Sequence, residues 1–260
     1  MENLVASDAM AAWQALKESI QDNGLTSMSQ VSAGWCRLMW LLDHEREAGR
    51  TGTAMSDAAY RRKGEWFSGL LRLLIEQRNH QLMASRKTVG GYSQPFKPNL
   101  VWPADDDPRL CLFTRVTGSS AAPGVSERDA LADFTNRRKE LKFAAVDLKL
   151  ASSPGSGSSE EMRSFPNSGL QSFQSWRTQK DPAVYVVWGA RLGPAEPVET
   201  CLEQLVAMTG TYLDGAALVA WRTNEAMDGY EWVRSGPDFD ADTLLSSIDA
   251  RIAANSVSDE

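Results

Sequence analysis

Residues 132–150 read ADFTNRRKELKFAAVDLKL, a stretch in which charged side chains interrupt apolar ones. We interpret it as a β-hairpin, with strands at residues 130–135 and 142–150 joined by a charged turn. Asp147 and Lys149 are two positions apart, so on a strand both side chains would project from the same face. The pattern therefore predicts a carboxylate and an amine side by side at an open strand end, where replacing Asp147 would leave the fold intact.

Asp133 lies on the first predicted strand of this hairpin and can reach the same region. Two carboxylates suit Mg²⁺, which prefers oxygen ligands and keeps some of its waters. The metal would polarise a phosphate and activate a bound water, and a lysine beside it could orient that water. With only two histidines and three widely separated cysteines, the chain offers little for a catalytic triad, a zinc site or a disulfide framework.

The same stretch resembles the active-site hairpin of the PD-(D/E)xK nuclease superfamily, whose pattern is an Asp, a variable gap and then (D/E)-x-K. Asp133, Asp147 and Lys149 fill these places, and Ala132 stands where a Pro often precedes the Asp. The resemblance implies that Asp133 and Asp147 hold Mg²⁺, that Lys149 acts in catalysis, and that Glu65 on the preceding helix is a further metal ligand. Glu76 is the other candidate for this ligand, and the alternative for Glu65 is an exposed helix carboxylate that pairs with Arg61 or Arg62.

Around this hairpin the periodicity of apolar residues predicts an α/β (α+β) chain with a mixed sheet flanked by helices. The resemblance implies that its centre is an αβββαβ core, preceded by an N-terminal helical region. We divide the chain into residues 1–55, the nuclease-like core at 56–222, and an acidic C-terminal segment at 223–260. Expected helices are 3–22, 29–47, 56–85, 168–179, 198–208 and 240–254, and further expected strands are 100–102, 110–116, 183–188 and 216–221.

The net charge is −7, and residues 224–260 carry all of it, with nine acidic residues against two arginines. We expect this segment to lie away from the hairpin, because its carboxylates would repel phosphate. Lys87, Arg137 and Arg138 are candidate phosphate contacts, although basic side chains on a surface often serve only solubility. The tryptophans, among them Trp66, Trp102, Trp176, Trp188 and Trp221, are expected in the core rather than in base stacking.

These features favour a Mg²⁺-dependent endonuclease that cleaves double-stranded DNA in a restriction or phage-defence system. The resemblance implies a homodimer and a cognate methyltransferase encoded nearby. Two alternatives stay open: a non-catalytic DNA-binding or scaffold subunit that retains the nuclease fold, and a repair or RNA nuclease on the same core. The chain has no apolar run long enough to cross a bilayer and no signal-peptide pattern, so we expect it in the cytoplasm, without membrane contact.

Overall fold

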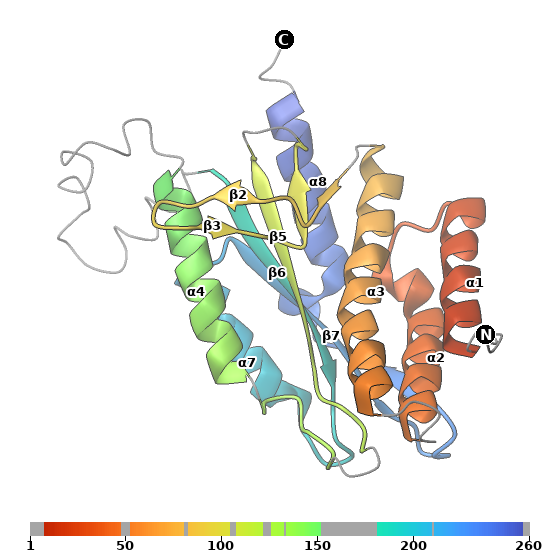
Figure 1. Ribbon diagram of the computed structural model, residues 1–260. Helices are drawn as coiled ribbons and strands as arrows, with labels where there is room; N and C mark the ends of the chain where they lie inside the picture. Colours follow the sequence, from red (N-terminus) through yellow and green to blue (C-terminus); the bar gives the residue numbers. More distant parts are fainter. Residues whose placement is uncertain are drawn as a thin grey trace.

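In the computed structural model of the protein, a twisted sheet runs between two layers of helices (Figure 1). The structure describes residues 8–47, 53–80, 83–104, 108–121, 126–132, 134–151, 181–209 and 211–256. None of the helices in these ranges is long and apolar enough to cross a membrane.

The main sheet has six strands in the order β1-β4-β5-β6-β7-β8. The central strands β5, β6 and β7 are parallel, whereas β4 pairs antiparallel with β5 and β8 pairs antiparallel with β7. Every residue of β6, AVYVVWGAR, is buried, as expected for a strand with helices on both faces. The strand bounds are β1 (Ala84–Ser85), β4 (Leu100–Trp102), β5 (Leu110–Thr117), β6 (Ala183–Arg191), β7 (Gly215–Thr223) and β8 (Tyr230–Val233).

Side chains of the sheet alternate between two hydrophobic cores, one on each face. Leu112 of β5 belongs to the core beneath the first helical layer and Phe113 to the core beneath the second. The first layer holds α1 (Asp8–Asn23), α2 (Met28–Glu47), α3 (Thr53–Asn79) and α8 (Ala241–Ser256). The second holds α4 (Phe134–Ala151) and α7 (Val198–Thr209). A short hairpin of β2 (Val89–Gly90) and β3 (Pro95–Phe96) lies against α4, and a 3-10 turn, η1 (Pro237–Phe239), precedes α8.

Tryptophans anchor both cores, as the sequence predicts. Trp35 meets Trp221 edge to face with ring centroids 5.8 Å apart, and Phe134 stacks on Trp188 at 3.9 Å. Trp188 also donates a hydrogen bond from Nε1 to Thr117 Oγ1 at 2.8 Å, so its polar atom is satisfied in the interior. Trp66, Trp102, Trp188 and Trp221 are all buried, and Trp176 lies outside the described residues.

The predicted hairpin at residues 130–135 and 142–150 is wrong, because residues 134–151 form the single helix α4. Its buried apolar residues recur at helical spacing, and the stretch KELKFAA consists largely of residues with good helix propensity. Alternating charge along a short segment does not by itself distinguish the two structures. The buried apolar residues of α4 are Phe134, Leu141, Ala144, Ala145 and Leu148.

The other predicted strands are confirmed, as are the helices at 29–47, 198–208 and 240–254. The helix predicted at 3–22 is α1 from Asp8 on, whereas the helix predicted at 56–85 ends too late, because α3 ends at Asn79 and residues 84–85 form β1. The predicted helix at 168–179 lies outside the described residues. The fold is therefore mixed α/β, with a mixed sheet flanked by helices. The part of the acidic segment that forms α8 packs on the face opposite α4, as predicted. There Asp242 accepts hydrogen bonds from the backbone amides at the start of α2, and Asp249 pairs with Arg78 of α3.

Candidate functional site

Asp147 holds the β2–β3 hairpin against α4. Its side chain is only 4% exposed, so the prediction that it faces an open site is wrong. The carboxylate accepts hydrogen bonds from the Ser93 hydroxyl at 2.7 Å, from the Ser93 amide at 3.0 Å and from the Gln94 amide at 3.4 Å. A Cβ at Gly91 would collide with this carboxylate and with the Phe96 ring, so the hairpin needs glycine there. Asp147 is thus a structural residue that fixes a turn.

Lys149 lies elsewhere, on the side of α4 that faces the sheet. It is 1% exposed, and its Nζ is 2.8 Å from Asp214 Oδ2, which also accepts the Val184 amide at 2.7 Å. Two residues along an α-helix are separated by about 200° around its axis. The structure therefore does not bring Asp147 and Lys149 together, and each has its own partner. Asp133 lies outside the described residues.

The remaining predicted site residues also have separate partners. Glu65 is half exposed and pairs with Arg86, 3.3 Å away, so it is a surface carboxylate as in the alternative, but its partner is not the predicted Arg61 or Arg62. Lys87 Nζ donates to the backbone carbonyl of Ala104 at 2.7 Å. Arg137 pairs with Glu140 at 3.0 Å, and Arg138 donates to Gln204 at 2.9 Å. Within the described ranges no three His, Cys, Asp or Glu side chains gather in a way that could hold a metal ion.

A different group of polar side chains converges between α3 and the antiparallel pair β4–β5. Asn99, immediately before β4, accepts the Thr114 amide at 2.9 Å and donates to Ser68 Oγ at 3.1 Å. The hydroxyls of Ser68 and Thr114 are 2.8 Å apart, and the Ser68 hydroxyl also donates to the Gly64 carbonyl. Each side-chain oxygen and nitrogen of this Ser68–Asn99–Thr114 cluster has at least one hydrogen-bond partner, and the cluster carries no formal charge. The sequence interpretation missed it, although Pro98-Asn99 immediately before the predicted strand at 100–102 was a visible signal.

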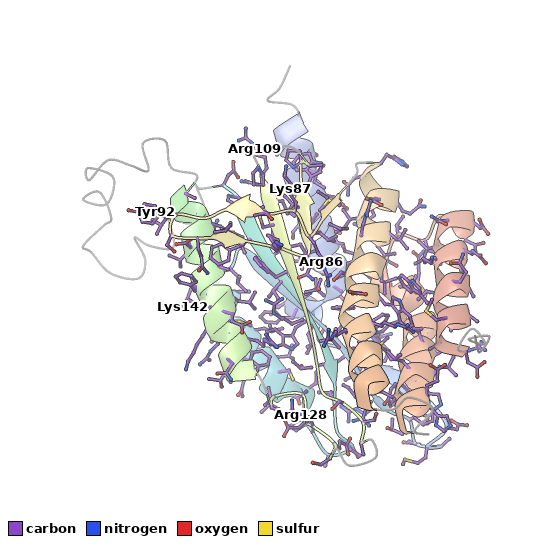
Figure 2. The ribbon with its side chains drawn as sticks, in the orientation of Figure 1. Arg86, Lys87, Tyr92, Arg109, Arg128 and Lys142 are labelled. Carbon is purple, nitrogen blue, oxygen red and sulfur yellow. The ribbon has the colours of Figure 1, made fainter. Side chains whose placement is uncertain are left out.

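A group of basic side chains lies on α4. Arg137, Arg138, Lys139 and Lys142, here called the α4 basic face, lie within two turns of this helix. Glu140 neutralises Arg137, but no described carboxylate is within ion-pairing distance of Lys139 or Lys142. Figure 2 shows Lys142 on α4 with Tyr92 near the end of that helix.

Exposed aromatic rings adjoin this basic face. Phe143 is 50% exposed and meets Phe96 edge to face at 5.7 Å, and Tyr92 is 47% exposed. The Tyr92 amide donates to the Asp147 carbonyl at 3.1 Å, which places Tyr92 beside the end of α4. Cationic side chains with exposed aromatic rings near them are typical of surfaces that contact nucleic acid.

A buried network of charges joins α2, α3 and the end of β6. Asp43 pairs with Lys63, and the Tyr230 hydroxyl donates to Asp43 at 2.7 Å and accepts from Arg191 at 2.6 Å. Arg191 also pairs with Glu127. Burial, followed by the charge of Asp43, raises the pKa of Tyr230 well above its ordinary value, so the phenol stays protonated. Removing one partner would leave a buried charge uncompensated and would lower the stability of the fold. The network therefore has the properties of a structural element.

The cysteines do not supply a nucleophile. Cys36, Cys111 and Cys201 are free and buried, and burial raises the pKa of each thiol to about 12. Thiolate is the reactive form of cysteine, so at neutral pH these three side chains behave as small apolar groups.

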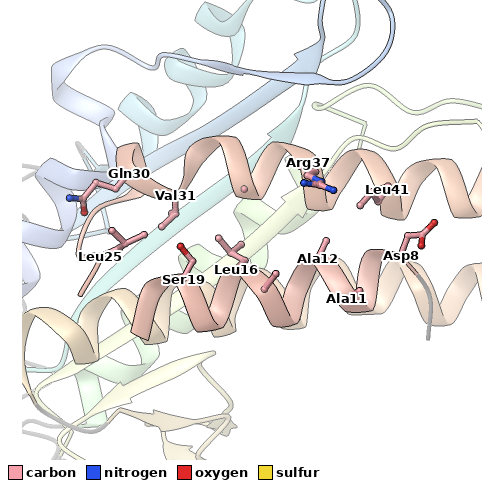
Figure 3. A pocket seen from close by; sticks show the side chains of 12 residues that line it. Asp8, Ala11, Ala12, Leu16, Ser19, Leu25, Gln30, Val31, Arg37 and Leu41 are labelled. Atoms are coloured by element: carbon pink, nitrogen blue, oxygen red, sulfur yellow. The ribbon is translucent and has the colours of Figure 1, made fainter. Parts of the chain in front are cut away.

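A hollow of about 620 Å³ lies between α1 and α2 (Figure 3). Its lining is mainly apolar, with small side chains such as Ala11 and Ala12, and only Asp8 and Arg37 add formal charge. Gly34 lets the two helices approach, because a Cβ there would lie 2.7 Å from a methyl group of Leu16. An opposed pair of charges on an apolar lining does not favour a polyanion such as DNA.

No protein-family model, no curated protein and no solved structure matches this chain. Its function therefore has to be inferred from its own residues.

Proposed function

We propose that this protein is a non-catalytic DNA-binding subunit built on a nuclease-like core. The observation that carries the proposal is the Ser68–Asn99–Thr114 cluster. Its uncharged side chains join helix α3 to strands β4 and β5 through hydrogen bonds.

The order of elements supports this interpretation. Helix α3, the pair β4–β5, helix α4 and strand β6 occur in this order along the chain, with the two-residue strands β1, β2 and β3 between α3 and β4. In the PD-(D/E)xK nuclease superfamily, whose motif residues 132–150 resemble in sequence although residues 134–151 form a helix here, an acid on the helix, the Asp of the first strand and the (D/E)-x-K of the second strand form the metal site. Pro98 precedes Asn99 as a Pro often precedes that Asp.

At these places the chain departs from the catalytic pattern. Ser68, Asn99 and Thr114 stand where carboxylates would be, and Val116 stands where the lysine would be. Neutral oxygens alone attract Mg²⁺ weakly, because the ion is held mainly by carboxylates and phosphates. A core of this kind would keep its shape while losing the charge needed for hydrolysis.

The residues first predicted to be catalytic add to this argument. Asp147 fixes the β2–β3 hairpin, and Lys149 is paired with Asp214 beneath α4. Catalysis by Asp133, Asp147 and Lys149 with Mg²⁺ stays a prediction, and so do the homodimer and the methyltransferase partner.

Binding to double-stranded DNA is proposed from the α4 basic face. Lys139 and Lys142 are exposed with no described carboxylate within ion-pairing distance, Phe143 adds an exposed ring next to Lys142, and Tyr92 adds another near the end of α4. Helix α8 and its carboxylates lie in the opposite layer, where they would repel DNA least. Because each neutralised phosphate contributes about −0.9 to the slope of log K against log salt, three contacts predict a slope near −3.

Two measurements on the purified protein test the proposal. Fluorescence anisotropy with a labelled duplex should show binding that weakens steeply with salt. Plasmid DNA incubated with Mg²⁺ or Mn²⁺ should stay supercoiled. Absence of duplex binding at low salt would overturn the DNA-binding proposal. Nicking that stops with EDTA and is lost in Asp133→Asn would restore the enzyme interpretation.

A further inference from the structure

A hollow of about 280 Å³ opens between α4 and the end of α7. Six residues line it, three of them cationic and none of them acidic: Arg138, Lys139, Lys142, Ala207, Thr211 and Tyr212. The cations come from α4, and the residues opposite come from the last turn of α7 and the segment after it.

The walls of this hollow are held in place by hydrogen bonds. Gln204 of α7 accepts a hydrogen bond from Arg138 Nη1 at 2.9 Å, which leaves other guanidinium donors available. The Tyr212 hydroxyl donates to the Arg138 carbonyl at 3.3 Å, and Thr211 Oγ1 donates to the Ala207 carbonyl at 2.7 Å. Burial raises the pKa of Tyr212 above its ordinary value, so the phenol adds no negative charge.

The positive charge in this hollow is not balanced from within the described part of the chain. Lys139 and Lys142 are three residues apart, so they lie on neighbouring turns of α4 and repel each other. No described carboxylate is within ion-pairing distance of either ammonium. A bound anion would remove this repulsion.

We propose that this hollow binds a phosphate group. A guanidinium offers paired N–H donors that match two phosphate oxygens, and the two ammonium groups add charge without a preferred direction. If the protein binds DNA as proposed above, the phosphate belongs to the DNA backbone and the hollow fixes the duplex on α4. The inference rests on the proposed function only where it assigns the phosphate to the DNA backbone rather than to a free phosphate group.

The test compares two double variants that remove the same charge. Lys139→Gln/Lys142→Gln changes the hollow, and Lys17→Gln/Arg37→Gln changes α1 and α2 in the opposite layer. Duplex affinity is measured by anisotropy across a salt series, and circular dichroism verifies the fold. We expect the hollow variant to bind about tenfold more weakly and to lose about one unit of the salt slope, as for one lost phosphate. The control variant should match the wild type.

A second measurement uses inorganic phosphate alone. Phosphate should raise the melting temperature of the wild type and of the control variant, because a ligand stabilises the state that binds it. It should raise the melting temperature of the hollow variant much less, and chloride at equal ionic strength should not distinguish the three proteins.

The outcomes separate the two proposals. If the wild type binds DNA and the hollow variant binds it equally well, with no difference in the phosphate effect, the phosphate site is refuted and DNA binding stands. If DNA does not bind but phosphate stabilises only proteins with an intact hollow, the site stands as one for a free phosphate group and the proposed function fails. If neither ligand has an effect, both proposals are wrong.

Discussion

Two polar regions of this protein differ in a way that the sequence conceals. On α4, Asp147 and Lys149 have the charges expected of a catalytic site, yet each is buried against a structural partner. Between α3 and β4–β5, the Ser68–Asn99–Thr114 cluster has no charge, yet it joins a helix and two strands at one point. A charged motif can therefore support a fold, whereas a cluster without formal charge can join a helix and two strands through hydrogen bonds alone.

The largest effect is expected at Lys149. Lys149→Met should lower the free energy of unfolding by about 3–5 kcal/mol, because it removes the ammonium partner of Asp214, a carboxylate with little solvent access. Urea unfolding measures this change. Lys149→Met/Asp214→Asn should recover more than half of the loss, since an amide oxygen can still accept the Val184 amide. A change within about 0.5 kcal/mol in the single variant would mean that Lys149 is as tolerant as a surface residue.

Asp147→Asn should have a smaller and more local effect, because the hairpin residues that it holds are partly solvated. Its amide nitrogen would face backbone donors, so we expect a loss of about 1–3 kcal/mol. Hydrogen exchange should accelerate at the amides of Ser93 and Gln94 while the core of β6 keeps its protection. Ser93→Ala, which removes one hydroxyl, is the matched control and should lose less. Unchanged exchange in Asp147→Asn would contradict the structural role.

The neutral cluster can be examined by introducing two carboxylates into it. Asn99→Asp/Thr114→Glu should melt several degrees below the wild type without metal, because Thr114 is buried and the two carboxylates would repel. Mn²⁺ should reverse part of that loss, since two carboxylates and the Ser68 hydroxyl could then ligate the ion. Asn99→Asp/Thr114→Gln is the control and should respond less to metal. Equal responses in both variants would argue against a nuclease-like geometry at this point.

The smallest effect is expected at Arg138. Arg138→Lys keeps the charge but loses the planar donor group and its fixed contact with Gln204. Stability should change by less than about 1 kcal/mol, as is typical of partly exposed pairs. Duplex affinity should fall about threefold, measured by the same anisotropy assay. An affinity equal to that of the wild type would mean that only the charge of this residue matters.

The sequence alone determined much of the framework. The unbroken apolar run of β6 and the spacing of apolar residues in α2 and α7 are local patterns, so they predict the correct elements. The mixed sheet flanked by helices followed from these patterns, and the acidic C-terminal segment followed from counting charged residues. The same reasoning gave the wrong element for residues 134–151. Their charged residues alternate with apolar ones as in a strand, but their apolar residues also recur at the spacing of a helix.

Only the tertiary structure decided which polar side chains meet. Asp147 is paired with Ser93, 54 residues earlier, and Thr114 meets Ser68 across 46 residues. Such partners are selected by how helices and strands pack, because burial makes an unpaired polar group costly wherever the chain places it. Residue types and spacing determine what chemistry is available, whereas packing determines which of those groups lie close enough to act together.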